Sequence, residues 1–290
     1  MPRVLKPFKY FEPQTIEEAC QILSQYGSEA KVLAGGTDVV VFMKKREISP
    51  KYIVYIKNIP GLDSIHYTEQ DGLRIGPFVT HQSITDSSII QGKFRLLATA
   101  CNKVGTPQIR NMGTIGGNVC MAGPSQDAIP PLLALEARLK LVSVDNTRTV
   151  PIDTFFLAPF QSILRPDEIL TGIEIPALPT NSAGCYRWVT KISTVDETLA
   201  GAAVIISRDI SDGTCKDIKI ALTSVAHTPM RAIKAEELIR NTKVSDDLVD
   251  RAAQVAADAT SPRSRADYRR RMTGVLVREA INEAWMKLKG

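Results

Sequence analysis

The sequence has few of the residues that bind metals or act as nucleophiles. Its 290 residues include 3 histidines, which are scattered, and 5 cysteines, none of which form a C-x-x-C pair. A zinc or iron–sulfur site needs clustered ligands, so we predict no metal site in this chain. The motifs G-x-S-x-G and H-E-x-x-H, which mark many hydrolases, are also absent. We interpret the cysteines as buried or half-buried free thiols.

Long apolar runs and a strong charge of one sign are missing as well. The formal net charge is +5 and charged residues make up 23% of the chain, a balance too weakly basic to indicate nucleic-acid binding. No apolar run approaches the roughly 20 residues that span a membrane. The opening "MPRVLKPFKYFEP" lacks the apolar core of a signal peptide. We expect a cytoplasmic globular protein with no membrane span and no nucleic-acid partner.

What the sequence does have is two clusters of glycine. The first, "LAGGTDVVV", begins at Leu33, where we predict that a short apolar strand runs into Gly35 and Gly36 before a helix starts. Exposed N–H groups at such a glycine turn and helix start can bind an anion, and the Thr37 hydroxyl adds a donor. The alternative is an ordinary glycine turn between strand and helix. The cluster matches neither the Walker A motif nor G-x-G-x-x-G.

The second cluster is "GTIGGNVC", from Gly113 to Cys120. Its Gly-Gly pair, flanked by Thr114 and Asn118, could act as a second anion-binding loop that approaches a ligand from another side. Asp127 follows nine residues after Asn118, where it could accept from a ribose hydroxyl or a flavin edge; alternatively, it is a helix N-terminal charge. Two such loops far apart in sequence could clamp one diphosphate between two lobes, which fits a dinucleotide better than a mononucleotide.

Helices and strands alternate over the first 60 residues. A helix is predicted from Thr15, which has capping-box spacing, to a stop at Gly27. The runs "KVLAGG" and "YIVYI" are predicted strands, and a helix starting at Thr37 or Asp38 lies between them. The order helix, strand, loop, helix, strand indicates an α/β unit with parallel strand pairing.

Beyond residue 60 strands become more frequent. "LRIGPFVTHQSI" reads as a strand, a turn and a helix capped near Thr80, and "FRLLATACNKV" as a further helix. "DAIPPLLALEA" is predicted as a helix or a loop. Two runs, "RLKLVSV" and "RTVPI", are predicted to pair about a turn at Asp145–Asn146, and "DEILTGIEIP" is another strand.

The best candidate for a domain boundary is "ALPTNSAG", residues 177–184, which is rich in Pro, Gly, Asn and Ser. We predict domains over 1–178, with subdomains of about 1–60 and 61–178, and over 179–290. Three strand-like runs follow the boundary ("CYRWVTKI", "LAGAAVIISR", "CKDIKIALTSV"), and then three helices over 230–240, 245–259 and 264–287. The basic run "RSRADYRRR" is either a solvated helix start or a surface that faces a partner.

Together, "KVLAGGTDVV" and "VGTPQIRNMGTIGGNVC" resemble the FAD-binding medium subunit of the molybdenum hydroxylase family, which includes carbon monoxide dehydrogenase and xanthine dehydrogenase. The resemblance extends over nearly the whole chain, through "FKYFEPQTIEEACQIL", "DEILTGIEIP", "KISTVDETLA" and "SRADYRRRMTGVLVREAI". It implies an α+β fold: a two-lobed FAD-binding fold of the vanillyl-alcohol oxidase type, followed by a small domain with a three-stranded antiparallel sheet packed with helices.

The resemblance also implies which residues bind FAD. The first glycine segment resembles the first diphosphate-binding segment of the family, and the second resembles its second segment. Val104 would pack near the flavin, Ile169 or Leu170 would make a backbone contact, and Lys191 would be a basic residue near the flavin. The implied cofactor-binding residues are Val32, Leu33, Ala34, Gly35, Gly36, Thr37, Asp38, Val39, Val104, Thr114, Gly116, Gly117, Asn118, Asp127, Ile169, Leu170 and Lys191.

The function that the resemblance implies is that of an electron-transfer flavoprotein subunit in an oxidoreductase. FAD would be noncovalent, since the first segment has no histidine, and no residue of this chain would be catalytic. A small subunit with [2Fe-2S] clusters would deliver electrons from a large molybdenum-cofactor subunit, in a dimer of heterotrimers. NAD, a quinone or oxygen would accept them. The alternatives are a self-contained FAD oxidase of the same fold and a nucleotide-binding regulatory protein without redox turnover.

Two departures from the family qualify the resemblance. There is no cysteine-rich insertion of the kind that carries an extra iron–sulfur cluster in the 4-hydroxybenzoyl-CoA reductase medium subunit, so that cluster should be absent. The segment "STVDET" after Lys191 lacks the paired arginines of many relatives. The outer face of the flavin, and therefore the electron acceptor, is left open by this difference.

Overall fold

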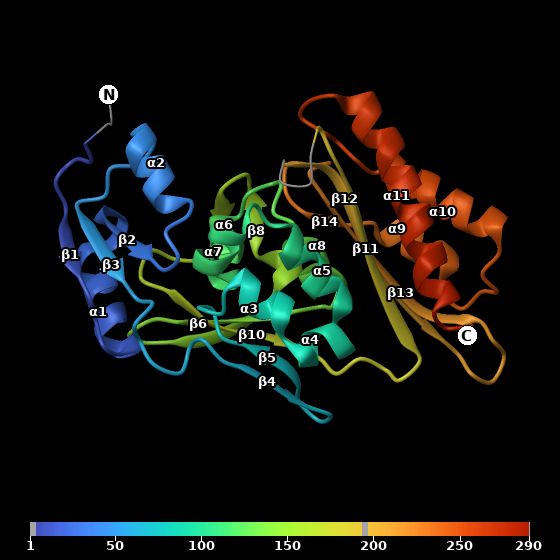
Figure 1. Cartoon of the computed structure of the whole chain (residues 1–290), viewed down its shortest axis with the longest axis horizontal. Coiled ribbons are helices and arrows are strands. Elements are labelled where there is room, and N and C mark those ends of the chain that lie inside the picture. Colours follow the sequence, from blue (N-terminus) through green and yellow to red (C-terminus); the bar gives the residue numbers. More distant parts are fainter. Residues whose placement is uncertain (1–3, 193–196, 290) are drawn as a thin grey trace.

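The first lobe is a small parallel sheet flanked by helices. The computed structural model describes residues 4–192 and 197–289, and in it the lobe forms one end of an elongated molecule (Figure 1). Its strands are ordered β1-β3-β2 and all pair in parallel, which confirms the predicted α/β unit. The elements are β1 (Lys9–Phe11), α1 (Ile16–Tyr26), β2 (Ala30–Leu33), α2 (Val39–Lys45) and β3 (Tyr52–Tyr55).

Helix α1 begins and ends where its sequence predicts. The Thr15 hydroxyl accepts a hydrogen bond from Glu18 N at 3.1 Å, and Gly27 ends the helix with a positive φ of 51°. Its buried face packs on the lobe through Ala19, Cys20 and Leu23. Strand β1 has no counterpart in the sequence prediction, because three residues are too few to show an alternating pattern.

The second lobe is a five-stranded antiparallel sheet in the order β4-β5-β10-β6-β7, with short helices packed beside it. The hairpin predicted about Asp145–Asn146 is present, and Ser143 N donates to Asn146 O at 2.8 Å. The strands are β4 (Ile65–Thr68), β5 (Gly72–Ile75), β6 (Arg138–Val142), β7 (Thr147–Pro151) and β10 (Ile169–Ile175), with the small hairpin β8 (Phe156–Ala158) and β9 (Gln161–Ser162).

The helices of the second lobe correct one expectation. The second glycine cluster is not a loop but helix α7, which Thr114 caps by accepting from Gly117 N at 3.1 Å. Glycine has a low helix propensity, so packing rather than propensity forms this helix. The predicted cap at Thr80 is confirmed. The helices are α3 (His81–Asp86), α4 (Ser88–Lys93), α5 (Arg95–Lys103), α6 (Pro107–Met112), α7 (Ile115–Met121) and α8 (Ile129–Ala134).

The C-terminal domain is an antiparallel sheet followed by helices, as predicted, but the sheet has four strands rather than three. Met230 and Arg231, expected to open a helix, pair with Leu222 and Ala221 as edge strand β14, and the helix begins only at Ile233. The elements are β11 (Ser182–Thr190), β12 (Thr198–Arg208), β13 (Cys215–Thr223), β14 (Met230–Arg231), α9 (Ile233–Ile239), α10 (Asp246–Asp258) and α11 (Ala266–Met286).

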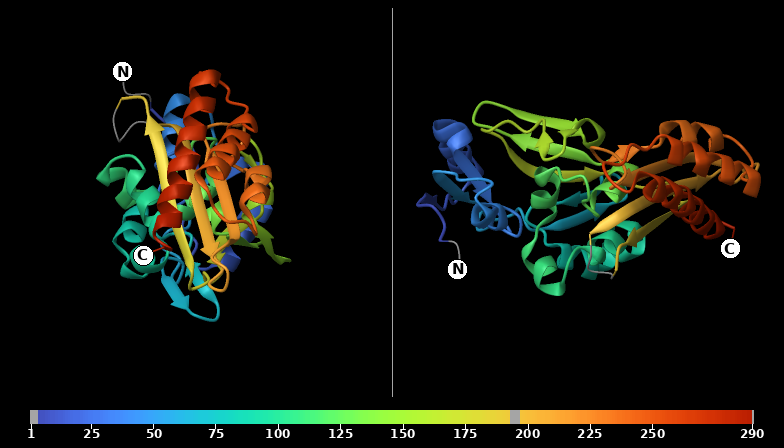
Figure 2. Two further views of the ribbon diagram at one scale, coloured as in Figure 1. Left: turned by 90° about the vertical axis from the view of Figure 1, so that its right-hand side faces the viewer. Right: turned by 90° about the horizontal axis from the view of Figure 1, so that it is seen from above.

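Both faces of the C-terminal sheet are buried. Along β12, Ala202, Val204 and Ile206 face the core formed with α9, α10 and α11. Ala203 and Ile205 point to the other face and join the core of the second lobe, where α5 and α8 pack on the sheet. The sheet is therefore a shared middle layer, and Figure 2 shows the first lobe, the second lobe and this domain in a row.

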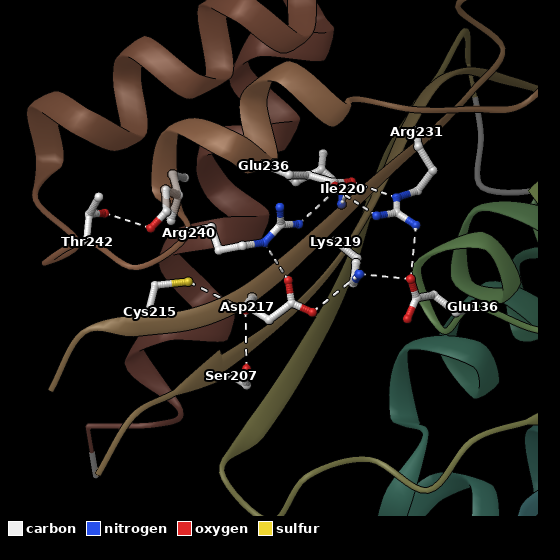
Figure 3. Close-up of polar contacts among 11 residues, drawn as sticks. Glu136, Ser207, Cys215, Asp217, Lys219, Ile220, Arg231, Glu236, Arg240 and Thr242 are labelled. Carbon is white, nitrogen blue, oxygen red and sulfur yellow. Dashed lines mark hydrogen bonds and ion pairs between the residues drawn. The ribbon is translucent and has the colours of Figure 1, made fainter. Parts of the chain in front are cut away.

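A chain of ion pairs joins the second lobe to the C-terminal domain at the edge of this shared core (Figure 3). Glu136, from the turn after α8, lies 2.8 Å from Lys219 and 3.8 Å from Arg231. Arg231 donates to both oxygens of the fully buried Glu236 at 2.6 Å, and Ile220 N donates to the same carboxylate at 2.8 Å. Because the buried charge is paired and hydrogen-bonded, this network fixes how the two domains meet.

Candidate functional site

The first glycine segment presents backbone donors that the protein leaves unused. Strand β2 ends at Leu33 and α2 begins at Val39, with Gly36 in a left-handed conformation at φ 74°. Within residues 4–192 and 197–289, no hydrogen bond engages the N–H groups of Gly35, Gly36 or Thr37. Consecutive unpaired N–H groups at a glycine turn before a helix form an anion-binding concavity.

The structure brings the two glycine segments together. A Cβ at Gly35 would overlap the Met112 carbonyl oxygen and lie 3.0 Å from Gly113 Cα, so the two backbones touch at this point. The Thr37 hydroxyl oxygen lies 3.4 Å from where a Gly113 Cβ would stand. Residues about 75 positions apart in the sequence therefore line one place, between the first and second lobes.

The second segment differs from the first, because its N–H groups are engaged. Ile115 N donates to Val79 O and Gly116 N to Pro77 O, both at 2.9 Å, and Gly117 N donates to the Thr114 hydroxyl. A Cβ at Gly116 would lie 2.7 Å from the Pro77 carbonyl oxygen, so glycine is needed here for helix packing. At Ile115–Gly117 the second segment therefore lacks the unbonded backbone donors that the first segment has.

The second segment offers a side-chain acceptor instead. Asn118 is buried and its Nδ2 donates to Gln126 Oε1, while its Oδ1 has no partner among the residues that the structure describes. A buried polar atom without a partner is unfavourable, which favours a ligand donor at this position. Gly117 is exposed, and outside its own helix backbone the described atom nearest to a Cβ there is Thr114 Oγ1 at 3.0 Å. The exposed Gly117 and the Asn118 acceptor thus belong to the same turn of α7.

Asp127 is held by the protein more tightly than its sequence position suggests. Its side chain is buried and accepts from Tyr186 Oη at 2.7 Å and from Thr198 Oγ1 at 2.6 Å, and Lys103 Nζ lies 3.7 Å from its second oxygen. Burial raises the pKa of this carboxyl, and Lys103 and the two hydroxyl donors oppose that rise. Sequence analysis gave no signal for these three partners, which come from α5, β11 and β12.

The remaining predicted residues lie on several other elements. Val104 is half-buried directly after α5, and Lys191 is exposed directly after β11; most of "STVDET", residues 193–196, lies outside the described residues. Ile169 and Leu170 are buried in β10, against which α7 packs. Val32 and Leu33 belong to β2, Ala34 directly precedes the glycine pair, and Asp38 is the N-cap of α2, which Val39 opens.

His81 is a residue at this site that the sequence prediction missed. It is buried, its backbone N donates to Gly113 O at 3.1 Å, and its ring lies 3.4 Å from the position of a Gly113 Cβ. In the described part of the chain its Nδ1 has no hydrogen-bond partner. Burial, assisted by the charge of Arg110, lowers the pKa of His81 to about 4, so the imidazole is neutral at pH 7. The only sequence signal was its place after the helix cap Thr80.

The thiols lie as expected: Cys120 is half-buried and the other four cysteines are buried, all of them free. No helix in the described part of the chain is both long and apolar enough to cross a membrane.

Two protein-family sequence models match the chain. Residues 6–178 match the family described as "FAD binding domain in molybdopterin dehydrogenase". Residues 189–284 match the "CO dehydrogenase flavoprotein C-terminal domain". The first match contains both glycine segments, His81 and Asp127, and the second contains Thr198.

Curated proteins and solved structures are similar over almost the full length. The medium chain of carbon monoxide dehydrogenase from Hydrogenophaga pseudoflava is 34% identical over 97% of this chain and 98% of its own. The xanthine dehydrogenase FAD-binding subunit of Escherichia coli O157:H7 is 30% identical over 95% of both chains. A solved structure of the Hydrogenophaga pseudoflava carbon monoxide dehydrogenase, lacking the Mo-pyranopterin moiety of its molybdenum cofactor, superposes with a TM-score of 0.93, covering 98% of this chain and 99% of that one at 35% identity.

Proposed function

Because this chain belongs to the family of FAD-binding medium subunits found in carbon monoxide dehydrogenase and xanthine dehydrogenase, we propose that it holds FAD noncovalently between its two lobes. The chain is thus a flavoprotein subunit of an oxidoreductase. The bound flavin supplies the redox chemistry, taking up electrons and passing them on, and the protein supplies binding, orientation and electrostatics.

The unused N–H groups of Gly35, Gly36 and Thr37 are the observation that carries this proposal. They would donate to the FAD diphosphate, next to the point where Gly35 meets Met112. Asn118 Oδ1 would accept from a hydroxyl of the cofactor. The residues present therefore fit FAD: the backbone donors suit its anionic part and the orphaned amide oxygen suits a neutral hydroxyl donor.

The other proposed FAD contacts rest on the family resemblance of their positions. Asp127 would act from its buried cluster. Val104, directly after α5, and Lys191, directly after β11, would lie near the flavin, and Ile169 or Leu170 of β10 would make a backbone contact. The FAD-binding domain would end near residue 178. The noncovalent state rests on the first segment, residues 32–39, which offers neither histidine nor cysteine.

We further propose the partners. A large subunit with a molybdenum cofactor would oxidise the substrate, and a small subunit with [2Fe-2S] clusters would deliver the electrons to FAD. NAD, a quinone or oxygen would be the final acceptor, and the assembly would be a dimer of heterotrimers in the cytoplasm. Support comes from the relatives, which are medium chains or FAD-binding subunits and not whole enzymes. The substrate would then be a property of the large subunit.

The test begins with the purified chain and FAD. Binding should give the visible flavin spectrum, and acid precipitation should release the colour into the supernatant. Colour that stays in the pellet would contradict noncovalent binding. An apoprotein that does not bind FAD would contradict the proposed function itself and would favour the nucleotide-binding regulatory protein. Purification of the native complex should recover molybdenum and iron together with this chain.

A second assay separates the subunit from a self-contained oxidase. The FAD-loaded chain is offered aldehydes, purines and N-heterocycles with an artificial dye as acceptor. We expect no turnover, because substrate chemistry would reside in the partner subunit. Reduction of a dye by NADH is the most that the isolated subunit should show. Robust substrate turnover without partners would favour the self-contained oxidase.

A further inference from the structure

The loop from Gly123 to Asp127 connects the second glycine segment to the C-terminal domain. It follows α7 directly, and Gln126 in this loop accepts from Asn118 Nδ2. The end of β13 holds the loop, since Ser224 N donates to Pro124 O at 2.9 Å and Thr223 Oγ1 donates to the same oxygen at 3.1 Å. A proposed FAD-binding helix is thus tied to the C-terminal sheet.

Asp127 ends this loop, and its carboxylate is surrounded by donors from three distant elements. Tyr186 of β11 and Thr198 of β12 donate to Oδ1, while Lys103 of α5 faces Oδ2. Lys103 and Asp127 have side chains only 2% and 9% exposed. A buried charge needs such partners, and hydrogen bonds to a charged group are stronger than neutral ones. The carboxylate is therefore fixed in position and not free to turn toward solvent.

The sheet is shaped to place the Tyr186 hydroxyl. A Cβ at Gly201, on the neighbouring strand, would lie 2.8 Å from Tyr186 Oη. The Tyr186 ring also stacks on Trp188, with centroids 5.4 Å apart and planes at 19°. The missing side chain at Gly201 leaves room for the Tyr186 hydroxyl, and the stacking on Trp188 holds the ring in the orientation in which the hydroxyl reaches Asp127.

We propose that Tyr186, Thr198 and Lys103 are positioning residues for FAD, acting through Asp127 and the 123–127 loop. The C-terminal domain then controls the affinity of a cofactor that the N-terminal domain binds. This inference rests on the proposed FAD binding, but two of its three residues lie outside that domain: Tyr186 lies between the two family matches and Thr198 lies within the second, whereas Lys103 lies within the first.

The test uses substitutions that remove one hydroxyl each, Tyr186→Phe and Thr198→Val. The dissociation constant is measured by titrating apoprotein with FAD and following quenching of flavin fluorescence. Each variant should bind FAD roughly tenfold more weakly, as expected for the loss of a hydrogen bond to a charged group. Thr198→Ser keeps the hydroxyl and should restore the affinity.

Thr260→Val is the matched control. Thr260 is a buried threonine of the same domain whose hydroxyl donates to Ala257 O at 2.7 Å and not to a residue of the 123–127 loop. This variant should lower the thermal midpoint of the apoprotein, by less than Thr198→Val does because its hydroxyl bonds to a neutral carbonyl oxygen, yet leave FAD affinity unchanged. A merely structural role for Thr198 would make the two variants alike in FAD binding, which would overturn the proposal.

A double-mutant cycle tests whether the residues act through Asp127. In the Asp127→Asn background, Tyr186→Phe should have little further effect on FAD affinity, because the interaction it removes is already weakened. Full additivity of the two substitutions would contradict the proposal, as would unchanged FAD affinity in the folded single variants. If the unmodified chain binds no FAD, the proposed function itself is wrong. If it binds FAD but the variants bind equally well, only the proposed coupling through Asp127 is wrong.

Discussion

The two glycine segments have similar sequences but use their backbones in opposite ways. At Gly35–Thr37 the N–H groups bond to nothing in the described residues, so they remain available. At Ile115–Gly117 the N–H groups bond to Val79, Pro77 and Thr114. The first segment is an open donor site, and the second is a helix start that the protein itself has satisfied.

The difference shows that a glycine pair does not by itself specify an anion site. At Gly116 the missing side chain lets α7 approach Pro77, which is a packing role. At Gly36 it permits a positive φ beside N–H groups that bond to no described residue, which suits the binding role that we propose for this segment. The two cases differ in whether acceptors of the protein itself form hydrogen bonds with the backbone N–H groups at the glycine pair.

The largest expected effect is at the first segment. Gly36→Val puts a β-branched side chain at φ 74° and 3.3 Å from Leu33 Cδ1, so the loop must rearrange. Losing one hydrogen bond to the diphosphate, at roughly 1.5–3 kcal/mol, should weaken FAD binding by about tenfold to 150-fold, and losing a second should weaken it further. FAD titration of the apoprotein measures this.

Gly61→Val is the control for backbone strain. Gly61 has a similar φ of 82°, and a Cβ there meets no described atom within 4 Å. It should lose comparable stability and keep its FAD affinity. Equal loss of FAD affinity in both variants would show that strain, not the first segment, sets binding.

The next effect is a pH dependence that comes from His81, which holds the start of the second segment. The pKa of His81 is lowered to about 4 from 6.5, so the unfolded chain binds more protons between these values. Stability should be complete above pH 6.5 and decline by roughly 3 kcal/mol as the pH falls toward 4. Urea unfolding at several pH values measures the slope, which should flatten in His81→Gln.

The exposed His66 provides the comparison for that measurement. His66→Gln should leave the slope between pH 4 and 6.5 as it is in the unmodified protein. A slope unaffected by His81→Gln would mean that the buried imidazole is not the titrating group.

A smaller effect concerns packing at the second segment. Gly116→Ala places a methyl group 2.6 Å from Pro77 Cβ, and the overpacking should destabilise the apoprotein by about 1–3 kcal/mol. Thermal or urea unfolding without FAD is the readout. Gly172→Ala in β10, where a Cβ lies 3.8 Å from Lys140 Cβ, should be tolerated. Unchanged stability of Gly116→Ala would remove the packing explanation for this glycine.

The smallest effect separates folding from binding within α7. In Gly117→Ala, alanine raises the helix propensity, but its methyl group comes close to Thr114 Oγ1. The two effects oppose each other, so the free energy of unfolding should change by less than about 1 kcal/mol. If FAD lies against this exposed turn, its affinity should fall roughly tenfold, the equivalent of about 1.4 kcal/mol. Equal FAD affinity in Gly117→Ala would place the cofactor away from the second segment.

Local signals in the sequence predicted much of the fold. The ends of α1 at Thr15 and Gly27 could be predicted because helix capping depends on residues that are neighbours in the chain. The parallel pairing of the first lobe could be predicted from the order of its helices and strands. Helix α7 was missed since glycine indicates loops, and its stability comes from packing on Pro77. Strand β14 was missed because it exists only through pairing with β13.

The candidate site divides in the same way. The first segment could be identified from its own residues, because strand, glycine turn and helix start are adjacent in the chain. The partners of Asp127 could not, since Lys103, Tyr186 and Thr198 come from three separate elements. His81 gave no signal beyond its place after the helix cap Thr80, because its burial depends on how α3 packs on the second segment.

A crystal structure of the FAD-loaded chain tests the central claim most directly. Oxygens of the FAD diphosphate should accept hydrogen bonds from the N–H groups of Gly35, Gly36 and Thr37, at about 2.7–3.2 Å. The N–H groups of Ile115, Gly116 and Gly117 should keep their bonds to Val79, Pro77 and Thr114. A diphosphate bound instead at the start of α7, with the first segment unengaged, would contradict the account.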